Sequence, residues 1–434
     1  ALPVIPHPDI PPPGRLFAPQ RANSRGMLLS EPAVREPLAA RLRQHLAMPV
    51  VAGAMIGGKR RSSTPEREIR SPQNQRAVVG TVSEATTEDL AEALELGDAA
   101  QSAWDRRGGT ERAEILERAG ALFEDRRERL MALLVAEAGK TIENALGDVR
   151  EAVDFLNYYA ARARMDFAGP VELPGPTGEA NTISLHGRGV FACISPWNFP
   201  LAIFTGQIAG ALAAGNAVIA KPAEQTPLIA QVAVELLHEA GVPGEILALL
   251  PGEGATIGAQ LVADRRIAGV AFTGGTDTAR AIAGSLAARE GPMIPLIAET
   301  GGLNAMIADS SALPEQVVRD VLTSAFDSAG QRCSALRVLC IQEDVADRLI
   351  ELLAGAMDTL ISGDPMDRTT DIGPVIDEAS RSSLEAYNQE MRETARDIRE
   401  LELPAAAANG TFVAPAAYEI SEAGAVDREV FGPV

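Results

Sequence analysis

The chain has 434 residues, of which 46% are hydrophobic and 23% are charged. This composition is typical of a globular protein that buries a core, and it excludes global disorder. The net charge of −20 argues against a nucleic acid or an anionic membrane surface as the main partner. The sequence shows no apolar run long enough to span a membrane and no secretory leader, so we expect a cytoplasmic protein.

The chain contains three cysteines, Cys193, Cys333 and Cys340, which are far too few for a disulfide framework in a chain of this length. An odd, sparse set of this kind is typical of a reducing compartment. Cys193 and Cys340 lie within apolar segments, and we expect both to be buried. The four histidines are scattered without zinc-ligand spacing, so no metal site is predicted.

The first nineteen residues contain seven prolines, which predicts an extended linker or strap over residues 1–30. A strap of this kind suggests a preceding domain. From Thr87 the pattern becomes helical. One helix carries an apolar face from Ile115 to Leu134 and is expected to end before Gly139, and the next buries a face from Ile142 to Leu156.

Residues 169–188 predict a protruding hairpin, and from Gly189 onward short apolar strands alternate with helices. This alternation predicts an α/β fold with a parallel, doubly wound sheet that binds ligands at the carboxyl ends of its strands. The expected strands span residues 190–195, 216–220, 245–250, 269–272, 305–308 and 334–341, and the expected helices of the last part span residues 314–328 and 344–361.

Two residues near the ends of predicted helices or strands are candidate catalytic residues. Cys333 lies in a turn with Gly330 and Arg332, and a tight, electropositive turn exposes a thiol and lowers its pKa. The alternative is a small buried hydrophobic residue. Glu299 ends an apolar strand before a Gly-Gly turn, where a desolvated carboxylate could act as a general base. The alternative for Glu299 is a salt-bridged strand end, which the residues alone favour.

Three loops follow predicted strands and could contact a ligand. Asn198 lies in a rigid loop with two prolines and could donate to an oxyanion, although turn chemistry also explains it. Lys221 and Glu224 lie where riboses bind in such sheets, and solvated loop charges are the alternative. The turn Thr273–Thr276 precedes a helix whose N-terminus could hold a phosphate. The dinucleotide fingerprint G-x-G-x-x-G is absent.

Six short motifs occur together, and the sequence resembles the aldehyde dehydrogenase superfamily in their order and spacing. They are PWNFP (196–200), KPAEQT (221–226), FTGG (272–275), ETGG (299–302), GQRC (330–333) and EVFGP (429–433). More closely, the chain is similar to the glutamate-semialdehyde (1-pyrroline-5-carboxylate) dehydrogenase module of bifunctional proline utilisation A proteins. The segments that carry this likeness are residues 150–160, 294–302, 324–337 and 370–375, together with the Pro-rich opening.

The resemblance implies a Rossmann-type NAD-binding domain formed by residues 31–168 and 189–300, and an α/β catalytic domain formed by residues 301–434. It makes residues 169–188 an oligomerisation hairpin, and it implies a homodimer or a higher homo-oligomer. It also implies a proline dehydrogenase domain in the same full-length polypeptide, which would hold FAD outside this chain. NAD is the cofactor implied for the chain itself, and no nucleic-acid partner is implied.

The activity implied is the NAD-dependent oxidation of L-glutamate γ-semialdehyde to L-glutamate, the second step of proline catabolism. Cys333 would attack the aldehyde, Asn198 would stabilise the oxyanion, and Glu299 would activate the water that hydrolyses the thioester. The residues implied to bind the cofactor are Ser195, Pro196, Trp197, Lys221, Glu224, Thr273, Gly274, Gly275, Thr276, Glu429 and Phe431. The residues implied to bind the substrate are Phe199, Arg332 and Ser334.

The sequence departs from the family pattern in two places. Gly275 stands where members usually have serine, so a phosphate contact would come from the backbone or from Thr276. The sequence stops at Val434, before the family's anchor loop for the substrate carboxylate, so we expect residues 1–434 expressed alone to be poorly soluble or inactive. Two other functions remain open, namely an aldehyde dehydrogenase for another small acidic semialdehyde and a catalytically silent assembly domain.

Overall fold

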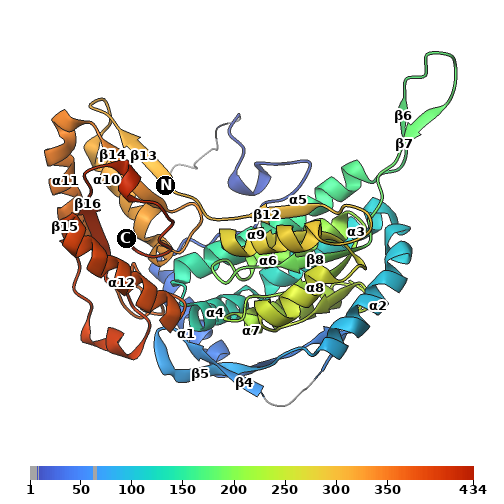
Figure 1. The fold of residues 1–434 in the computed structure, drawn as a ribbon, viewed down its shortest axis with the longest axis horizontal. Helices are drawn as coiled ribbons and strands as arrows, with labels where there is room; N and C mark the ends of the chain where they lie inside the picture. The colour runs from blue at the N-terminus through green and yellow to red at the C-terminus, as the bar shows by residue number, and fades with distance from the viewer. Residues whose placement is uncertain (1–6, 8, 62–65) are drawn as a thin grey trace. The chain divides into compact units, whose positions relative to one another are not determined.

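In the computed structural model, which describes residues 7, 9–61 and 66–434, the chain forms two compact units (Figure 1). The first contains the described residues up to Arg67 together with residues 80–132 and 146–299, and the second contains residues 68–79, 133–145 and 300–434. The family resemblance implied that residues 68–79 and 133–145 belong to the NAD-binding domain. The structure groups them with the second unit, where Ser71 Oγ donates to the Ala136 carbonyl at 2.6 Å and the Thr411 N–H donates to the Pro72 carbonyl at 2.8 Å.

The first unit is built around a seven-stranded sheet in the order β12-β11-β8-β9-β10-β2-β3. The five strands from β12 to β10 run parallel, as the alternation of strands and helices predicted, and β2 and β3 continue the sheet in antiparallel fashion. The strands are β2 (Met55–Ile56), β3 (Lys59–Arg60), β8 (Val190–Ile194), β9 (Ala217–Lys221), β10 (Leu247–Leu249), β11 (Ile267–Thr273) and β12 (Leu296–Glu299). The central strands β8 and β9 are almost entirely buried, which explains their continuous apolar sequences.

The helices of this unit begin and end at residues that satisfy their backbone groups. The helix expected from Thr87 starts there because Thr86 and Asp89 form a capping box, in which the Thr86 hydroxyl accepts the Asp89 N–H at 3.1 Å. Gly139, which the structure groups with the second unit, follows the helix that ends at Ala138, and its φ of +66° is typical of a residue past a helix end. The helices that precede β12 in the chain are α1 (Pro32–Leu46), α2 (Thr87–Asp105), α3 (Gly108–Asp125), α4 (Arg127–Ala138), α5 (Ile142–Asp166), α6 (Ala202–Ala213), α7 (Pro227–Glu239), α8 (Ala259–Ala263) and α9 (Thr276–Ala287).

The expectation of one helix with an apolar face from Ile115 to Leu134 was wrong. The structure has two helices, α3 and α4, which are separated at Arg126, where φ and ψ are −99° and 11°. Six consecutive charged residues, 124–129, lie between the buried side chains of Phe123 and Leu130. This charged run interrupts the apolar periodicity for more than one turn, which a continuous buried helix face does not tolerate.

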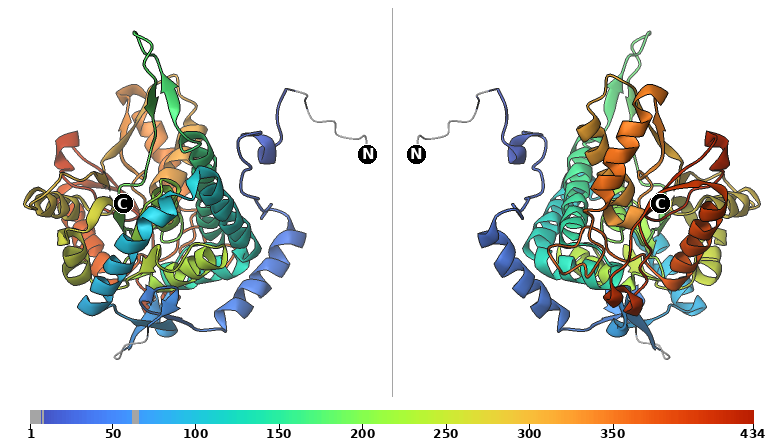
Figure 2. Two further views of the ribbon diagram at one scale, coloured as in Figure 1. Left: turned by 90° about the vertical axis from the view of Figure 1, so that its right-hand side faces the viewer. Right: turned by 90° about the vertical axis from the view of Figure 1, so that its left-hand side faces the viewer.

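The predicted hairpin is formed by β6 (Val171–Leu173) and β7 (Asn181–Ile183), and it projects from its unit as a two-stranded arm (Figures 1 and 2). Val171 lies opposite Ile183 in the register, and Leu173 lies on the same face. These three apolar side chains are exposed. The hairpin therefore presents one apolar face and one polar face, the latter with Glu172 and Thr182.

The second unit packs helices against a parallel pair of strands, β13 (Asn304–Ala308) and β14 (Leu336–Ile341). Its core includes Val318, Phe326, Leu349, Met357 and Leu384. The other elements of its main segment are α10 (Pro314–Phe326), α11 (Glu343–Met357), α12 (Glu378–Thr394) and the antiparallel pair β15 (Arg396–Glu400) and β16 (Ala416–Glu419). The remaining strands of the chain, β1 (Val50–Ala52), β4 (Glu66–Ser71) and β5 (Asn74–Ser83), form a three-stranded sheet in the order β1-β5-β4.

Burial was predicted correctly for one of the two cysteines in apolar segments. Cys193 in β8 is buried, but Cys340 in β14 is exposed, which corrects the prediction. Cys340 lies opposite Ile307 of β13, and the Ile307 side chain is 83% exposed. The face of this strand pair that carries both residues is not covered by the described chain, and an apolar strand sequence alone does not reveal that.

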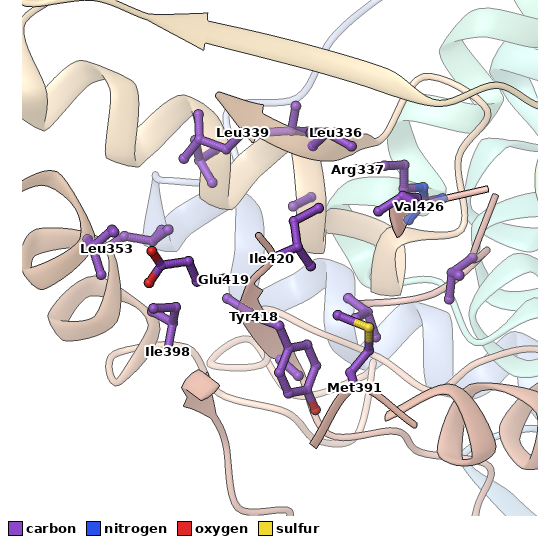
Figure 3. Close-up of a pocket in the computed structure, with 18 of the residues that line it drawn as sticks. Leu336, Arg337, Leu339, Leu353, Met391, Ile398, Tyr418, Glu419, Ile420 and Val426 are labelled. Carbon is purple, nitrogen blue, oxygen red and sulfur yellow. The ribbon is translucent and has the colours of Figure 1, made fainter. Parts of the chain in front are cut away.

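A cavity of about 300 Å³ lies in the second unit, among side chains from β14, β16, α11 and α12 (Figure 3). Leu336, Leu353, Met391 and Ile420 are among the residues that line it. Cys333 and Ser334 do not line this cavity, so it is not the predicted substrate site.

No helix within the described residues is both long enough and apolar enough to be a candidate membrane span.

Candidate active site

The strand order of the first unit reverses between β8 and β11. From β8 the chain builds β9 and β10 on one side, and then returns to place β11 and β12 on the other. In open α/β sheets such a switch point, beyond the carboxyl ends of the strands, is where ligands bind. Gln207 of α6 bridges the two strand ends, since its Nε2 lies 3.2 Å from the Ile194 carbonyl oxygen and 3.1 Å from Thr273 Oγ1. The predicted cofactor loops therefore start at this switch point.

The loop from Ser195 to Leu201, which contains Pro196, Trp197, Asn198 and Phe199, is anchored at both of its ends. The N–H of buried Ser195 donates to the Lys221 carbonyl at 3.1 Å. At the other end, the fully buried Asp148 of α5 accepts the Ala202 N–H at 2.7 Å and so caps the first turn of α6. Asn198 is half-buried between these anchors. Sequence analysis missed Asp148, although a carboxylate within the apolar face of the helix from Ile142 was a usable signal.

Lys221 is the last residue of β9 and Glu224 follows that strand, and the two side chains have different surroundings. The Lys221 side chain is buried, and its Nζ donates to the Pro222 carbonyl at 3.0 Å. Burial lowers the pKa of Lys221, whereas the carboxylates of Glu224 and Glu84 act to raise it. Glu224 is half-buried, and its Oε1 accepts the Gly254 N–H at 2.6 Å. A cation and a carboxylate are thus held at the carboxyl edge of the sheet.

The partner of Glu224 begins a turn that sequence analysis did not assign to the site. Residues Gly254–Gly258 form one turn of π-helix before α8. Such turns are rare and occur frequently at functional sites. The glycines at 252, 254 and 258 were the available signal, but their spacing did not match a known fingerprint.

The turn Thr273–Thr276 joins β11 to α9. The Gly274 N–H donates to the Glu299 carbonyl at 3.1 Å, and Thr276 is the first residue of α9. Among the described residues, and leaving out Gly275 itself and its two chain neighbours, no heavy atom lies within 4 Å of the position that a Gly275 Cβ would occupy. The first N–H groups of α9 therefore lie beside open space, a geometry that suits a phosphate group.

Glu299 ends β12 opposite Thr273 in the register. Its side chain is exposed, as are those of Ile297 and Ala298. In the described chain this carboxylate is thus exposed to solvent, and its role as a general base stays a prediction. β12 is the edge strand of the sheet, and β11 is its only paired neighbour within the part of the chain that the structure describes.

Cys333 lies in the second unit on a strained loop. Ser328, Ala329 and Gly330 precede it with φ of 58°, 54° and 66°, and the first two are the only non-glycine residues with positive φ among the described residues. Backbone strain of this kind clusters at functional sites and persists where the surroundings enforce it. The Cys333 side chain is exposed, so the buried alternative does not apply.

Arg332, predicted to contact substrate, is engaged by its own loop. Its Nη2 donates to the carbonyl of Ser324 at 3.1 Å and to that of Thr323, and its Nη1 lies 3.6 Å from Asp327 Oδ2. These contacts tie the loop to the end of α10. Its role in substrate binding stays a prediction, as does that of the exposed neighbour Ser334.

Glu429 lies against the Gly-Gly turn that follows β12. A Cβ on Gly301 would come within 1.6 Å of Glu429 Oε2, so a larger residue at position 301 would displace this carboxylate. Burial raises the pKa of Glu429, while Arg337 and a hydrogen bond from the Gly302 backbone act to lower it. Phe431 lies nearby, with its ring 5.6 Å from the Arg337 guanidinium carbon. Sequence analysis did not single out Arg337.

No group of three or more His, Cys, Asp and Glu side chains in the described part of the chain is arranged to hold a metal ion.

The sequence matches the family model described as "Aldehyde dehydrogenase family" over residues 59–434. The chain belongs to the aldehyde dehydrogenase family. This membership confirms the resemblance drawn from the six motifs, and it confirms the expected fold.

Within the family, the chain is similar to two kinds of named protein. The chain is 47% identical over 449 residues to "Bifunctional protein PutA" of Escherichia coli (strain K12), an alignment that covers 99% of this chain and 32% of that protein. It is 35% identical over 386 residues to a "1-pyrroline-5-carboxylate dehydrogenase" of Geobacillus sp. (strain WCH70), covering 88% of this chain and 74% of that protein. The chain thus spans about a third of the length of the PutA relatives.

Solved structures agree with these relatives. A 1-pyrroline-5-carboxylate dehydrogenase from Thermus with bound NAD superposes with a TM-score of 0.89 at 31% identity, covering 95% of this chain and 80% of that one. PutA of Bradyrhizobium japonicum, as the D779W mutant, gives a TM-score of 0.87 at 48% identity, covering 98% of this chain and 40% of that one.

Proposed function

We propose that this chain catalyses the NAD-dependent oxidation of L-glutamate γ-semialdehyde to L-glutamate, the second step of proline catabolism. The observation that carries the proposal is the exposed thiol of Cys333 on a strained loop, in a chain 35% identical to a protein named 1-pyrroline-5-carboxylate dehydrogenase. A silent assembly domain has no need of this thiol. We further propose that the chain belongs to a polypeptide with a proline dehydrogenase domain, because the PutA relatives are about three times its length.

The residues at the edge of the sheet fit NAD. Lys221 Nζ and the Glu224 carboxylate offer a donor and an acceptor for ribose hydroxyls, and the open space at Gly275 leaves room for a phosphate at the start of α9. The Glu224 carboxylate also disfavours a 2′-phosphate, and so favours NAD over NADP. Ser195, Pro196, Trp197, Thr273, Glu429 and Phe431 are proposed to complete the cofactor site.

Each proposed catalytic residue has one task. The Cys333 thiolate attacks the aldehyde carbon and forms a C–S bond, and the resulting oxyanion accepts hydrogen bonds from the Asn198 amide and the Cys333 N–H. When bound, NAD supplies the two-electron acceptor for the oxidation. Glu299 then takes a proton from water as its oxygen attacks the thioester carbon, which breaks the C–S bond, releases glutamate and restores the thiolate. Phe199 is proposed to line the aldehyde pocket.

The test is NADH formation by the natural full-length polypeptide with a panel of aldehydes. Glutamate semialdehyde should be the preferred substrate, Cys333→Ala should abolish oxidation without weakening NAD binding, and Glu299→Gln should release about one equivalent of NADH and then stall. Preference for another small acidic semialdehyde would support the general dehydrogenase instead. Absence of NADH with every aldehyde would support the assembly domain.

We also propose that the β6–β7 hairpin mediates a homodimer or a higher homo-oligomer. The apolar face formed by Val171, Leu173 and Ile183 is exposed on an arm whose two strands, among the described residues, pair only with each other. Exposed apolar surface of this kind marks interaction sites. The cytoplasmic location stays a prediction.

A further inference from the structure

Arg337, the second residue of β14, places a buried guanidinium between two functional segments of the second unit. Its side chain is 3% exposed. Nη1 donates to the Gly432 carbonyl at 2.8 Å, and Nη2 donates to the Gly330 carbonyl at 2.7 Å and, at a longer 3.4 Å, to the Arg332 carbonyl. One planar fork therefore joins the loop that carries Cys333 to the last residues of the EVFGP motif.

The contact with the Arg332 carbonyl acts on the peptide group that carries the Cys333 N–H. In a planar trans peptide the C=O and the N–H point in opposite directions, so holding the Arg332 carbonyl also directs the Cys333 N–H. A hydrogen bond to the carbonyl also polarises the peptide group, which makes its N–H a stronger hydrogen-bond donor. On the other side, Asn304 Nδ2 donates to the Cys333 carbonyl at 2.7 Å. The peptide groups before and after Cys333 are thus both held.

The same guanidinium faces Glu429 and Phe431. Its Nη2 lies 4.0 Å from Glu429 Oε1, and its carbon lies 5.6 Å from the centre of the Phe431 ring. Both Glu429 Oε1 and Arg337 Nε are buried atoms without a hydrogen-bond partner among the described residues. The Glu429 side chain is only 20% exposed, and a partly desolvated carboxylate is costly without a nearby positive charge, so the guanidinium helps to keep Glu429 in place.

We propose that Arg337 is a positioning residue that holds the Arg332–Cys333 peptide and the Glu429–Gly432 segment in one fixed arrangement. The proposal rests on the proposed function, in which the Cys333 N–H stabilises the oxyanion and Glu429 contacts NAD. It follows that binding of NAD at Glu429 changes the reactivity of Cys333, and that this effect is transmitted through Arg337. A residue that only filled space would show no such coupling.

The test is Arg337→Lys in the natural full-length polypeptide, since lysine keeps the charge but loses the planar fork. Arg319→Lys is the matched control, because Arg319 is exposed on α10 and pairs with Asp320 at the surface. The first readout is steady-state oxidation of glutamate semialdehyde. The second is the rate of Cys333 alkylation by iodoacetamide with and without saturating NAD, in a Cys340→Ser background because Cys340 is also exposed.

We expect Arg337→Lys to lower kcat by about 10- to 100-fold, because small misplacements of reacting groups and oxyanion donors have effects of this size, with KM for the aldehyde changed by less than about threefold. NAD should alter the alkylation rate of the wild-type chain and of Arg319→Lys, but should change that of Arg337→Lys by less than about twofold. An unchanged kcat, or an NAD effect on alkylation equal to that of the wild type, would overturn the proposal.

A second variant and the alkylation measurement decide the role of Arg337 even if the first variant does not fold or the wild-type chain is inactive. If Arg337→Lys does not fold, Glu429→Gln tests the same link with an isosteric side chain, and at saturating NAD it should also remove the NAD effect on alkylation. A wild-type NAD effect in Glu429→Gln would overturn the proposal. If the wild-type chain does not oxidise glutamate semialdehyde, the proposed function fails, whereas the alkylation readout still decides the role of Arg337.

Discussion

Gly330 is the position where one added methyl group tests the geometry of the Cys333 loop most directly. Its φ of +66° lies in the left-handed region, where an L side chain is strained. A Cβ at this position would lie 2.1 Å from the Gly432 carbonyl oxygen and 2.8 Å from the Ala325 carbonyl oxygen. Both neighbours are backbone atoms, so neither can turn away as a flexible side chain could.

The magnitude of the Gly330→Ala effect follows from two contributions. Left-handed backbone costs an L-residue about 1–2 kcal/mol. The Gly432 carbonyl must also retreat, and because it accepts from Arg337 Nη1 at 2.8 Å, its movement leaves a buried guanidinium poorly satisfied at a cost of about 1–3 kcal/mol. We therefore expect the free energy of unfolding of the second unit to fall by about 2–5 kcal/mol, and its unfolding midpoint by about 5–15 °C.

The assay is thermal unfolding together with the rate of Cys333 alkylation by iodoacetamide. Gly355→Ala is the matched control, because Gly355 lies in α11 of the same unit and, outside the backbone of its own helix and its chain neighbours, no described atom lies within 4 Å of the added Cβ. That change should stabilise the unit by about 0.5–1 kcal/mol, since alanine favours helix over glycine. A Gly330→Ala chain with a wild-type midpoint and a wild-type alkylation rate would refute the reasoning.

Three further predictions concern the cofactor loop, a buried thiol and the hairpin. Glu224→Ala should weaken NAD binding and raise the relative affinity for NADP, and equal affinities before and after the change, measured by equilibrium dialysis, would place Glu224 outside the site. Burial raises the pKa of Cys193 to about 12, so alkylation of this thiol at pH 8 should require unfolding. In the unfolded chain the thiol ionises near its ordinary pKa of 9.0. The contribution of Cys193 to the free energy of unfolding should therefore be lost as the pH rises from about 9 to about 12. Labelling of Cys193 in the folded chain at pH 8, detected by mass spectrometry, would contradict this. Ile183→Glu should lower the oligomeric mass in light scattering whereas Thr182→Glu, on the opposite face of the hairpin, should not, and an equal effect of both would count against the apolar face as the interface.

Local sequence patterns predicted the parallel strands from β8 to β14 and several helix boundaries, but not β1 to β5, β15 and β16. β8 and β9 were predictable because a strand buried on both faces must be apolar throughout. The start of α2 was predictable from Thr86 and Asp89, since a capping box satisfies backbone groups within four residues of each other. The motifs around Asn198, Glu299 and Cys333 sufficed to predict the family, which the match over residues 59–434 confirmed.

Tertiary structure alone decided which side chains are buried and which partners they meet. Cys340 lies in a two-stranded pair, and Glu299 ends the edge strand of the seven-stranded sheet. No local pattern states whether another element covers such a strand. Asp148 caps a helix that begins 54 residues later in the chain, and Arg337 bonds a carbonyl 95 residues away. Such contacts depend on where distant segments meet, whereas hydrophobic periodicity and capping record only the neighbours within a turn or two of the chain.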